Sequence, residues 1–220
     1  MHRSDDHVRD IYVQYGCGFC APPQWRNFDV SPTLWLERLP LIGRYVRINE
    51  QRFPGNVEYS DIVKGLPIRE DSCLGVYASH VLEHLSLDDF RAALRNTFKI
   101  LRGGGRFRLV VPDLETLAKR YIDSPSPEAA FQFMRDTSLG QERRPRSLVA
   151  MLREAMGNSK HLWMWDFKSL SAELQQAGFV KIRRCSFGDS NDLMFRNVEE
   201  PGRFEDAVGI ECEKPGNLKI

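Results

Sequence analysis

Short runs of apolar residues, each bounded by glycine, proline or charged turn residues, recur along the chain. Runs of this length are typical of buried strands. They predict seven strands, over 11–15, 25–30, 56–62, 74–79, 107–111, 180–187 and 207–213.

Apolar residues at helical spacing lie between several of these strands. The clearest stripe spans 87–101, with Asp88 and Asp89 favouring its N-terminus and Gly103–Gly105 expected to end it. Further helices are predicted over 34–41, 114–122, 127–137, 147–156 and 169–178.

The alternation of strand, helix and glycine turn predicts an α/β fold, with a doubly wound, mostly parallel, Rossmann-like sheet of seven strands. The first crossover is expected to be shortened, and a helical insertion over about 114–168 is expected after the fifth strand. A length of 220 residues suits a single domain over 1–220.

The composition argues against some classes of binding partner. The 31 Lys and Arg residues against 30 Asp and Glu residues give a charge of +1, which argues against nucleic acid as the partner. No run reaches the roughly 18 apolar residues of a membrane span. The polar stretch Met1–Asp10 argues against a signal peptide and predicts a cytoplasmic protein. Five scattered cysteines are expected to be reduced.

A glycine turn, Gly16-Cys17-Gly18, closes the first predicted strand. Glycine there allows a ligand to approach the backbone closely. Asp29 follows only eleven residues after Gly18, too few for a crossover helix and a strand, since the helical connection alone needs about a dozen residues. The missing helix entry argues against a dinucleotide, but not against a nucleoside without phosphates.

At this point the chain resembles the class I S-adenosylmethionine-dependent methyltransferases, and more narrowly a bacterial subgroup associated with polysaccharide clusters. The resemblance rests on the order and spacing of eight segments: Tyr15-Gly16-Cys17-Gly18, Trp25–Asp29, Ser60-Asp61-Ile62 with Leu66-Pro67, Ser79–Leu85, Leu101–Gly105, Val111–Leu114, His161–Met164 and Ala177-Gly178-Phe179.

The resemblance implies a cofactor site for S-adenosylmethionine. Gly16–Gly18 would line its methionine end, Asp29 would accept from the ribose hydroxyls, and Asp61 would accept from the adenine amino group with Ile62 packed on the ring. The full expected set is Tyr15, Gly16, Cys17, Gly18, Asp29, Asp61, Ile62 and Ser79. The family often has an acidic residue where this chain has Gln14, which supplies no charge.

Four residues are candidates for catalysis: His80, Asp113 and His161, with Asp166 beside the last. His80 follows the fourth strand, at the edge that faces the ligand crevice in open α/β sheets, and could take a proton from an acceptor. Asp113 follows the fifth strand, and His161 could enter from the insertion together with Asp166. A structural role stays an alternative for each. The expected acceptor is a small molecule or glycan, and a homodimer stays open.

Three alternative interpretations remain. Cys17-Gly18-Phe19-Cys20 is a C-x-x-C sequence that would suit a thiol redox protein. His80-Val81-Leu82-Glu83-His84 matches the H-x-x-E-H zinc motif, although its apolar residues favour a structural turn, and no metal is predicted. Gln14 leaves open a noncatalytic relative that only binds S-adenosylmethionine.

Overall fold

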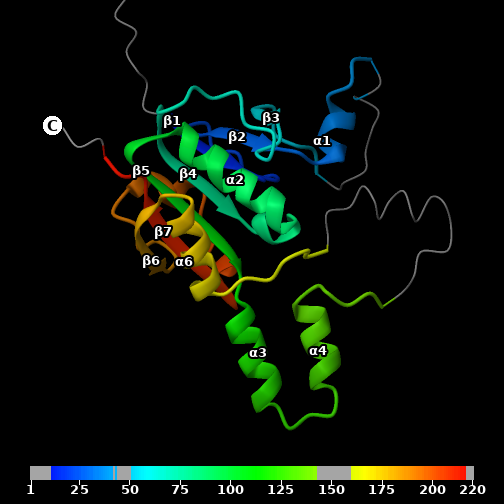
Figure 1. The fold of residues 1–220 in the computed structure, drawn as a ribbon. Helices are drawn as coiled ribbons and strands as arrows, with labels where there is room; N and C mark the ends of the chain where they lie inside the picture. The colour runs from blue at the N-terminus through cyan, green and yellow to red at the C-terminus, as the bar shows by residue number, and fades with distance from the viewer. Residues whose placement is uncertain (1–10, 42, 44–50, 143–159, 217–220) are drawn as a thin grey trace, which may run out of the picture.

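The computed structural model describes residues 11–41, 43, 51–142 and 160–216. Seven strands form one sheet in the order β3-β2-β1-β4-β5-β7-β6 (Figure 1). Neighbours from β3 to β5 are parallel, and β7 is antiparallel to both β5 and β6. The strands are β1 (Ile11–Tyr15), β2 (Arg26–Asp29), β3 (Val57–Tyr59), β4 (Cys73–Ser79), β5 (Leu101–Pro112), β6 (Val180–Cys185) and β7 (Ala207–Glu213). The predicted doubly wound, mostly parallel sheet is confirmed.

Helices and short turns connect the strands: α1 (Pro32–Glu37), the 3-10 turn η2 (Leu82–His84), α2 (Leu87–Ile100), α3 (Leu114–Asp123), α4 (Ala129–Asp136), α6 (Phe167–Gln176), and the 3-10 turns η3 (Leu193–Asn197) and η4 (Pro201–Phe204). The pair α3 and α4 extends beyond the sheet edge, as expected for the insertion (Figure 1). The helix predicted over 147–156 lies outside the described residues. Among the helices described, none combines the length and apolarity that a membrane crossing needs.

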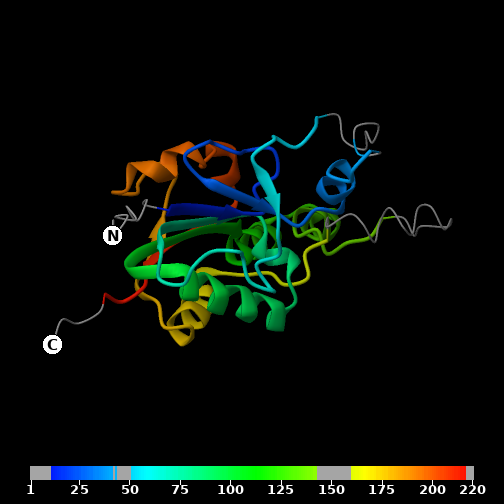
Figure 2. The ribbon, with the colours of Figure 1, turned by 90° about the horizontal axis from the view of Figure 1, so that it is seen from above.

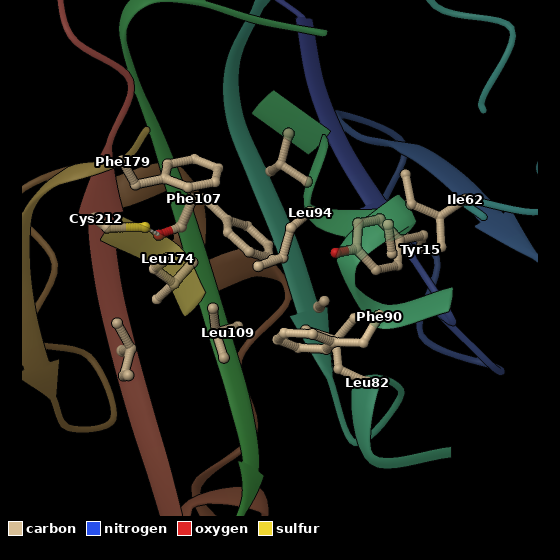
Figure 3. Close-up of a cluster of buried hydrophobic side chains, with 14 of the residues drawn as sticks. Tyr15, Ile62, Leu82, Phe90, Leu94, Phe107, Leu109, Leu174, Phe179 and Cys212 are labelled. Carbon is tan, nitrogen blue, oxygen red and sulfur yellow. Dashed lines mark hydrogen bonds between the residues drawn. The ribbon is translucent and has the colours of Figure 1, made fainter. Parts of the chain in front are cut away.

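Helices α2 and α6 cover one face of the sheet. Ser86 caps α2 by accepting from the Asp89 amide, and the buried stripe of α2 packs on the sheet. Phe107 on β5 contacts Phe179 at a ring separation of 5.7 Å, which joins the sheet to the end of α6 (Figure 3). This apolar layer forms the main core.

The opposite face is covered by the connection between β6 and β7 (Figure 2). No helix forms between β1 and β2, so a helix that would normally cover this face is missing. Phe195 and Val198 from the β6–β7 connection pack instead on Trp25, Tyr77 and Val110. The shortened first crossover therefore explains why this late segment lies across the sheet.

The expected role of the glycines after α2 is wrong. Helix α2 ends at Ile100, because Leu101 already adopts an extended backbone and pairs with Cys73 of β4. Gly103–Gly105 lie within β5, where the register between β4 and β5 shifts. A Cβ on Gly105 would lie 2.7 Å from the Cys73 carbonyl oxygen, so the glycines allow this close approach of β5 to β4.

A buried cation joins β5 to the β6–β7 connection. The Arg108 side chain is fully buried and donates to Asp189 at 2.9 Å, to Glu211 at 3.1 Å and to the carboxylate of Glu199. It also donates to the Ser186 carbonyl at 2.6 Å. Arg183 also pairs with Asp189 and Glu211, so the fully buried Glu199 is the carboxylate that depends on Arg108 for compensation.

We expect Arg108→Met to destabilise the fold by about 3 to 5 kcal/mol, because it leaves the fully buried Glu199 carboxylate without its cation. The measurement is the free energy of unfolding in urea. Arg91→Met, which removes a surface pair with Glu173, is the matched control and should shift the urea midpoint only slightly. Equal shifts in the two variants would contradict this account.

Candidate active site

The turn after β1 folds back onto β2. Gly16 and Gly18 have φ values of 63° and 54°, in the left-handed region that favours glycine. The Cys17 amide donates to the Phe28 carbonyl at 3.1 Å, and the Gly18 amide donates to the Asp29 carboxylate at 2.9 Å. The glycine turn and the end of β2 are thus directly bonded.

Two carboxylates follow on neighbouring strand ends. Asp29 is 8% exposed and also accepts from the Ser31 amide at 2.7 Å. The Ser60 amide donates to the Asp29 carbonyl at 3.1 Å, which carries the β2–β3 pairing onward and brings Asp61 to the same edge. Asp61 accepts from the Val63 amide at 2.9 Å, and its side chain is 24% exposed. Ile62, by contrast, is buried in the main core.

A small cavity of about 20 Å³ lies beside the glycine turn. Gly16, Cys17 and Ser79 line it, together with Glu200 and Arg203 from around η4. Ser79 Oγ is buried and has no hydrogen-bond partner among the described residues. The volume is close to that of a single water molecule, so a larger ligand requires Glu200 and Arg203 to move.

The Gln14 side chain has a structural role at this turn. Its side chain is buried, and its Nε2 donates to the Cys20 carbonyl at 2.7 Å and to Asn27 Oδ1 at 2.6 Å. Sequence reasoning missed this amide network, because nothing in the spacing shows which groups face Gln14. Tyr15 also points away from the turn, with its hydroxyl 3.2 Å from Thr97 Oγ1 in the core.

The two cysteines of the C-x-x-C sequence are poor nucleophiles. Cys17 and Cys20 lie in a tight turn, where the Cys20 amide donates to the Cys17 carbonyl at 3.0 Å. Burial raises the pKa of both thiols, with the charge of Asp29 adding to the effect on the Cys17 pKa and that of Glu200 to the effect on the Cys20 pKa. A redox cysteine needs the opposite shift, so this environment counts against the redox interpretation.

A second cavity, of about 280 Å³, lies between β5, the inserted helices and the β6–β7 connection. Its wall includes two of the predicted catalytic residues, His80 and His161. The acidic residues Asp136, Glu205 and Asp206 also line it, and Arg120 pairs with Asp136 and Asp206. The structure therefore brings His80 and His161 to a common space.

His80 occupies a constrained position directly after β4. Its φ of 53° lies in the left-handed region, and its Nε2 donates to the Arg203 carbonyl at 2.9 Å. Burial alone would lower the pKa of His80, but the nearby Glu83 carboxylate and this hydrogen bond outweigh it and raise the pKa. For His161, burial dominates and lowers the pKa.

The two aspartates proposed beside these histidines serve as helix caps. Asp113 accepts from the Glu115 amide at 3.1 Å and from the Thr116 hydroxyl at 3.0 Å, which starts α3. Asp166 accepts from the Ser169 amide at 2.7 Å and starts α6. The structure therefore directs both carboxylates into the first turns of their own helices.

No family model and no curated protein matches the sequence. A crystal structure of a SAM-dependent methyltransferase from Thermotoga maritima, a possible histamine N-methyltransferase, is similar at a TM-score of 0.50 and 14% identity, over 93% of this chain and 82% of that chain. A SAM-dependent methyltransferase from Archaeoglobus fulgidus gives a TM-score of 0.49 and 15% identity, over 93% and 86%. The similarity to the Thermotoga maritima structure shows that the two chains share a fold.

A third similar structure is a Haemonchus contortus phosphoethanolamine N-methyltransferase in complex with S-adenosylhomocysteine. Its TM-score is 0.49 at 9% identity, over 94% of this chain. This chain spans only 49% of that enzyme.

Gly16→Ala is expected to cost more stability than Gly18→Ala. Both positions have positive φ, which costs alanine about 1 to 2 kcal/mol. A Cβ on Gly16 would also lie 2.1 Å from Val81 Cγ2, whereas a Cβ on Gly18 meets no atom within 4 Å. Crowding raises the expected cost at Gly16 to about 2 to 4 kcal/mol. Urea unfolding measures both, and equal costs would disprove the close contact with Val81.

Gln14→Glu is expected to destabilise the protein, although it introduces the acidic residue that the family resemblance led us to expect near this turn. A carboxylate cannot donate, so the Cys20 carbonyl and Asn27 Oδ1 would lose their shared donor, at a cost of about 1 to 3 kcal/mol. The control is Gln14→Met. It removes the same donor but adds no buried charge, so it should destabilise the protein less than Gln14→Glu does. A Gln14→Glu variant as stable as the parent would show that the amide network is unimportant.

Proposed function

We propose that this protein binds S-adenosylmethionine at the carboxyl ends of β1, β2 and β3, and transfers its methyl group to a small molecule or glycan. The observation that carries the proposal is the direct bond from the Gly18 amide to the Asp29 carboxylate, with Asp61 on the adjacent strand end. A glycine bend and two carboxylates suit a nucleoside that presents hydroxyl and amino donors.

The residues present fit this cofactor. Position 18 leaves open space where a Cβ would stand, and Ser79 Oγ offers an unused polar group beside the turn. Asp29 and Asp61 each keep acceptor capacity beyond the amides they already bind, because a carboxylate has about four acceptor sites. When bound, S-adenosylmethionine supplies an electrophilic methyl group on a sulfonium.

The 280 Å³ cavity is the proposed place for the acceptor. It adjoins the cofactor region: Ser79 lines the smaller cavity and His80, the next residue, lines the larger one. Arg203 lines the first cavity, and its carbonyl accepts from His80 of the second. The imidazoles and carboxylates on the wall favour a polar acceptor with hydroxyl or amino groups, whose positioning is the main requirement of methyl transfer.

Binding of S-adenosylmethionine and S-adenosylhomocysteine can be measured by calorimetry and by the melting temperature, which a ligand of the folded state raises. Asp61→Asn should weaken binding by about 1 to 3 kcal/mol, because an amide group replaces an acceptor that faces the ligand's donors. Asp88→Asn, on the exposed N-terminus of α2, is the matched control and should bind as the parent does.

Two outcomes would contradict the proposal. Unchanged melting at millimolar ligand would remove the cofactor assignment, and equal affinities of Asp61→Asn and the parent would remove Asp61 from it. Turnover is measured as transfer of labelled methyl groups to a panel of sugars, amines and phenols. Binding without transfer to any of them would favour a noncatalytic relative.

A further inference from the structure

A buried carboxylate lies among three imidazoles at the turn after β4. The Glu83 side chain is 1% exposed, and neither of its oxygens has a hydrogen-bond partner among the described residues. Its Oε1 lies 3.5 Å from His80 Nδ1, 3.9 Å from His84 Nε2 and 4.0 Å from His161 Nε2. A buried charge without hydrogen bonds is costly, so this arrangement calls for a further partner.

The geometry points to a divalent transition-metal site formed by Glu83, His84 and His161, with His80 beside it. One ligand atom from each of the first three residues lies within 4.8 Å of the others. Ligand atoms around one tetrahedral zinc ion lie about 3.3 Å apart, given metal–nitrogen bonds of about 2.0 to 2.1 Å. Side-chain shifts of less than about 1 Å would close that difference.

The outer hydrogen bonds aim the correct nitrogens at the metal position. His84 Nδ1 donates to the Lys160 carbonyl at 2.9 Å, which leaves the lone pair on Nε2, the atom nearest Glu83. His80 Nε2 donates to the Arg203 carbonyl, which leaves the lone pair on Nδ1. A backbone carbonyl bonded to the far nitrogen is the usual support of a metal-binding histidine.

The backbone fixes the segment that brings His161. The Leu162 and Trp163 amides donate to the Glu83 carbonyl at 2.8 and 3.1 Å. The rings of His84 and His161 meet edge to face, with centroids 5.0 Å apart. Residues almost eighty positions apart in the chain are therefore held together by main-chain bonds that do not involve the imidazoles.

Two imidazoles and one carboxylate suit zinc or a similar first-row ion, and leave a coordination position open. His80 and His161 line the 280 Å³ cavity, whose wall also carries Asp136, Glu205 and Asp206. The cavity gives the ion a route to solvent.

The competing explanation is a cluster that holds protons, in which a charged His80 compensates Glu83 without any metal. The two explanations differ in what Glu83→Gln does. With a metal, this variant loses a ligand and binds the ion at least about tenfold more weakly. With protons alone, the parent and the variant bind metal equally poorly.

The test uses the full chain, stripped with a chelator and freed of any histidine tag. Zn²⁺ binding is measured by calorimetry and by metal analysis after gel filtration, and Co²⁺ serves as a spectroscopic probe. We expect one ion per chain, a rise in melting temperature with Zn²⁺, and visible Co²⁺ bands without the sulfur charge-transfer bands of a cysteine site. Glu83→Gln and His161→Gln should lose stoichiometric binding while keeping the circular dichroism spectrum of the parent.

Two control variants test whether the effect is specific to the proposed metal ligands. Glu173→Gln makes the same chemical change at a surface ion pair, and Cys20→Ser removes a partly exposed thiol that could bind zinc elsewhere. Both should bind one ion with the affinity of the parent. A parent without stoichiometric binding, or a Glu83→Gln variant that retains it, would overturn the proposal. No nucleoside is present in these measurements, so the result is independent of the proposed methyl transfer.

Discussion

The short connection between β1 and β2 is the constraint on which much of this structure depends. Because no helix fits there, the chain turns at once through two glycines in left-handed conformation, and the Gly18 amide reaches the Asp29 carboxylate. The same shortening means that no helix between β1 and β2 covers the sheet. The β6–β7 connection covers one face of the sheet instead, and the buried charges around Arg108 hold it in place. The bond between the glycine turn and Asp29 and the unusual cover of the sheet thus have one cause.

Much of the fold could be predicted from the sequence, because buried strands and amphipathic stripes are local signals. The bounds of β1 and β7 match the prediction, and α2 begins at the predicted residue. The prediction was wrong at Gly103–Gly105, since a glycine run after a helix has the same appearance whether it ends the helix or lets the next strand approach its neighbour closely. The close contact between Gly105 and Cys73 distinguishes these two roles, and it joins residues that are distant in the sequence.

The candidate site was less predictable, because it too depends on contacts between residues that are distant in the sequence. The glycine turn, Asp29 and Asp61 were expected together because of the family resemblance, and they lie after the successive strands β1, β2 and β3. The roles of Gln14, Asp113 and Asp166 depend on neighbours that spacing does not show: an amide network in the first case and helix caps in the other two. The H-x-x-E-H sequence was interpreted as a structural turn without a metal, and His161 joins Glu83 only when the chain is folded.

His80 is the residue where the separate parts of the edge meet. Its left-handed backbone turns the chain sharply after β4, so that one ring nitrogen faces Arg203 of η4 and the other faces Glu83 of η2. A movement of η4 that enlarges the small cavity beside Gly16 must break or carry along the bond to His80. The small cavity beside Gly16 and the imidazole cluster are therefore joined through His80 and its bond to Arg203.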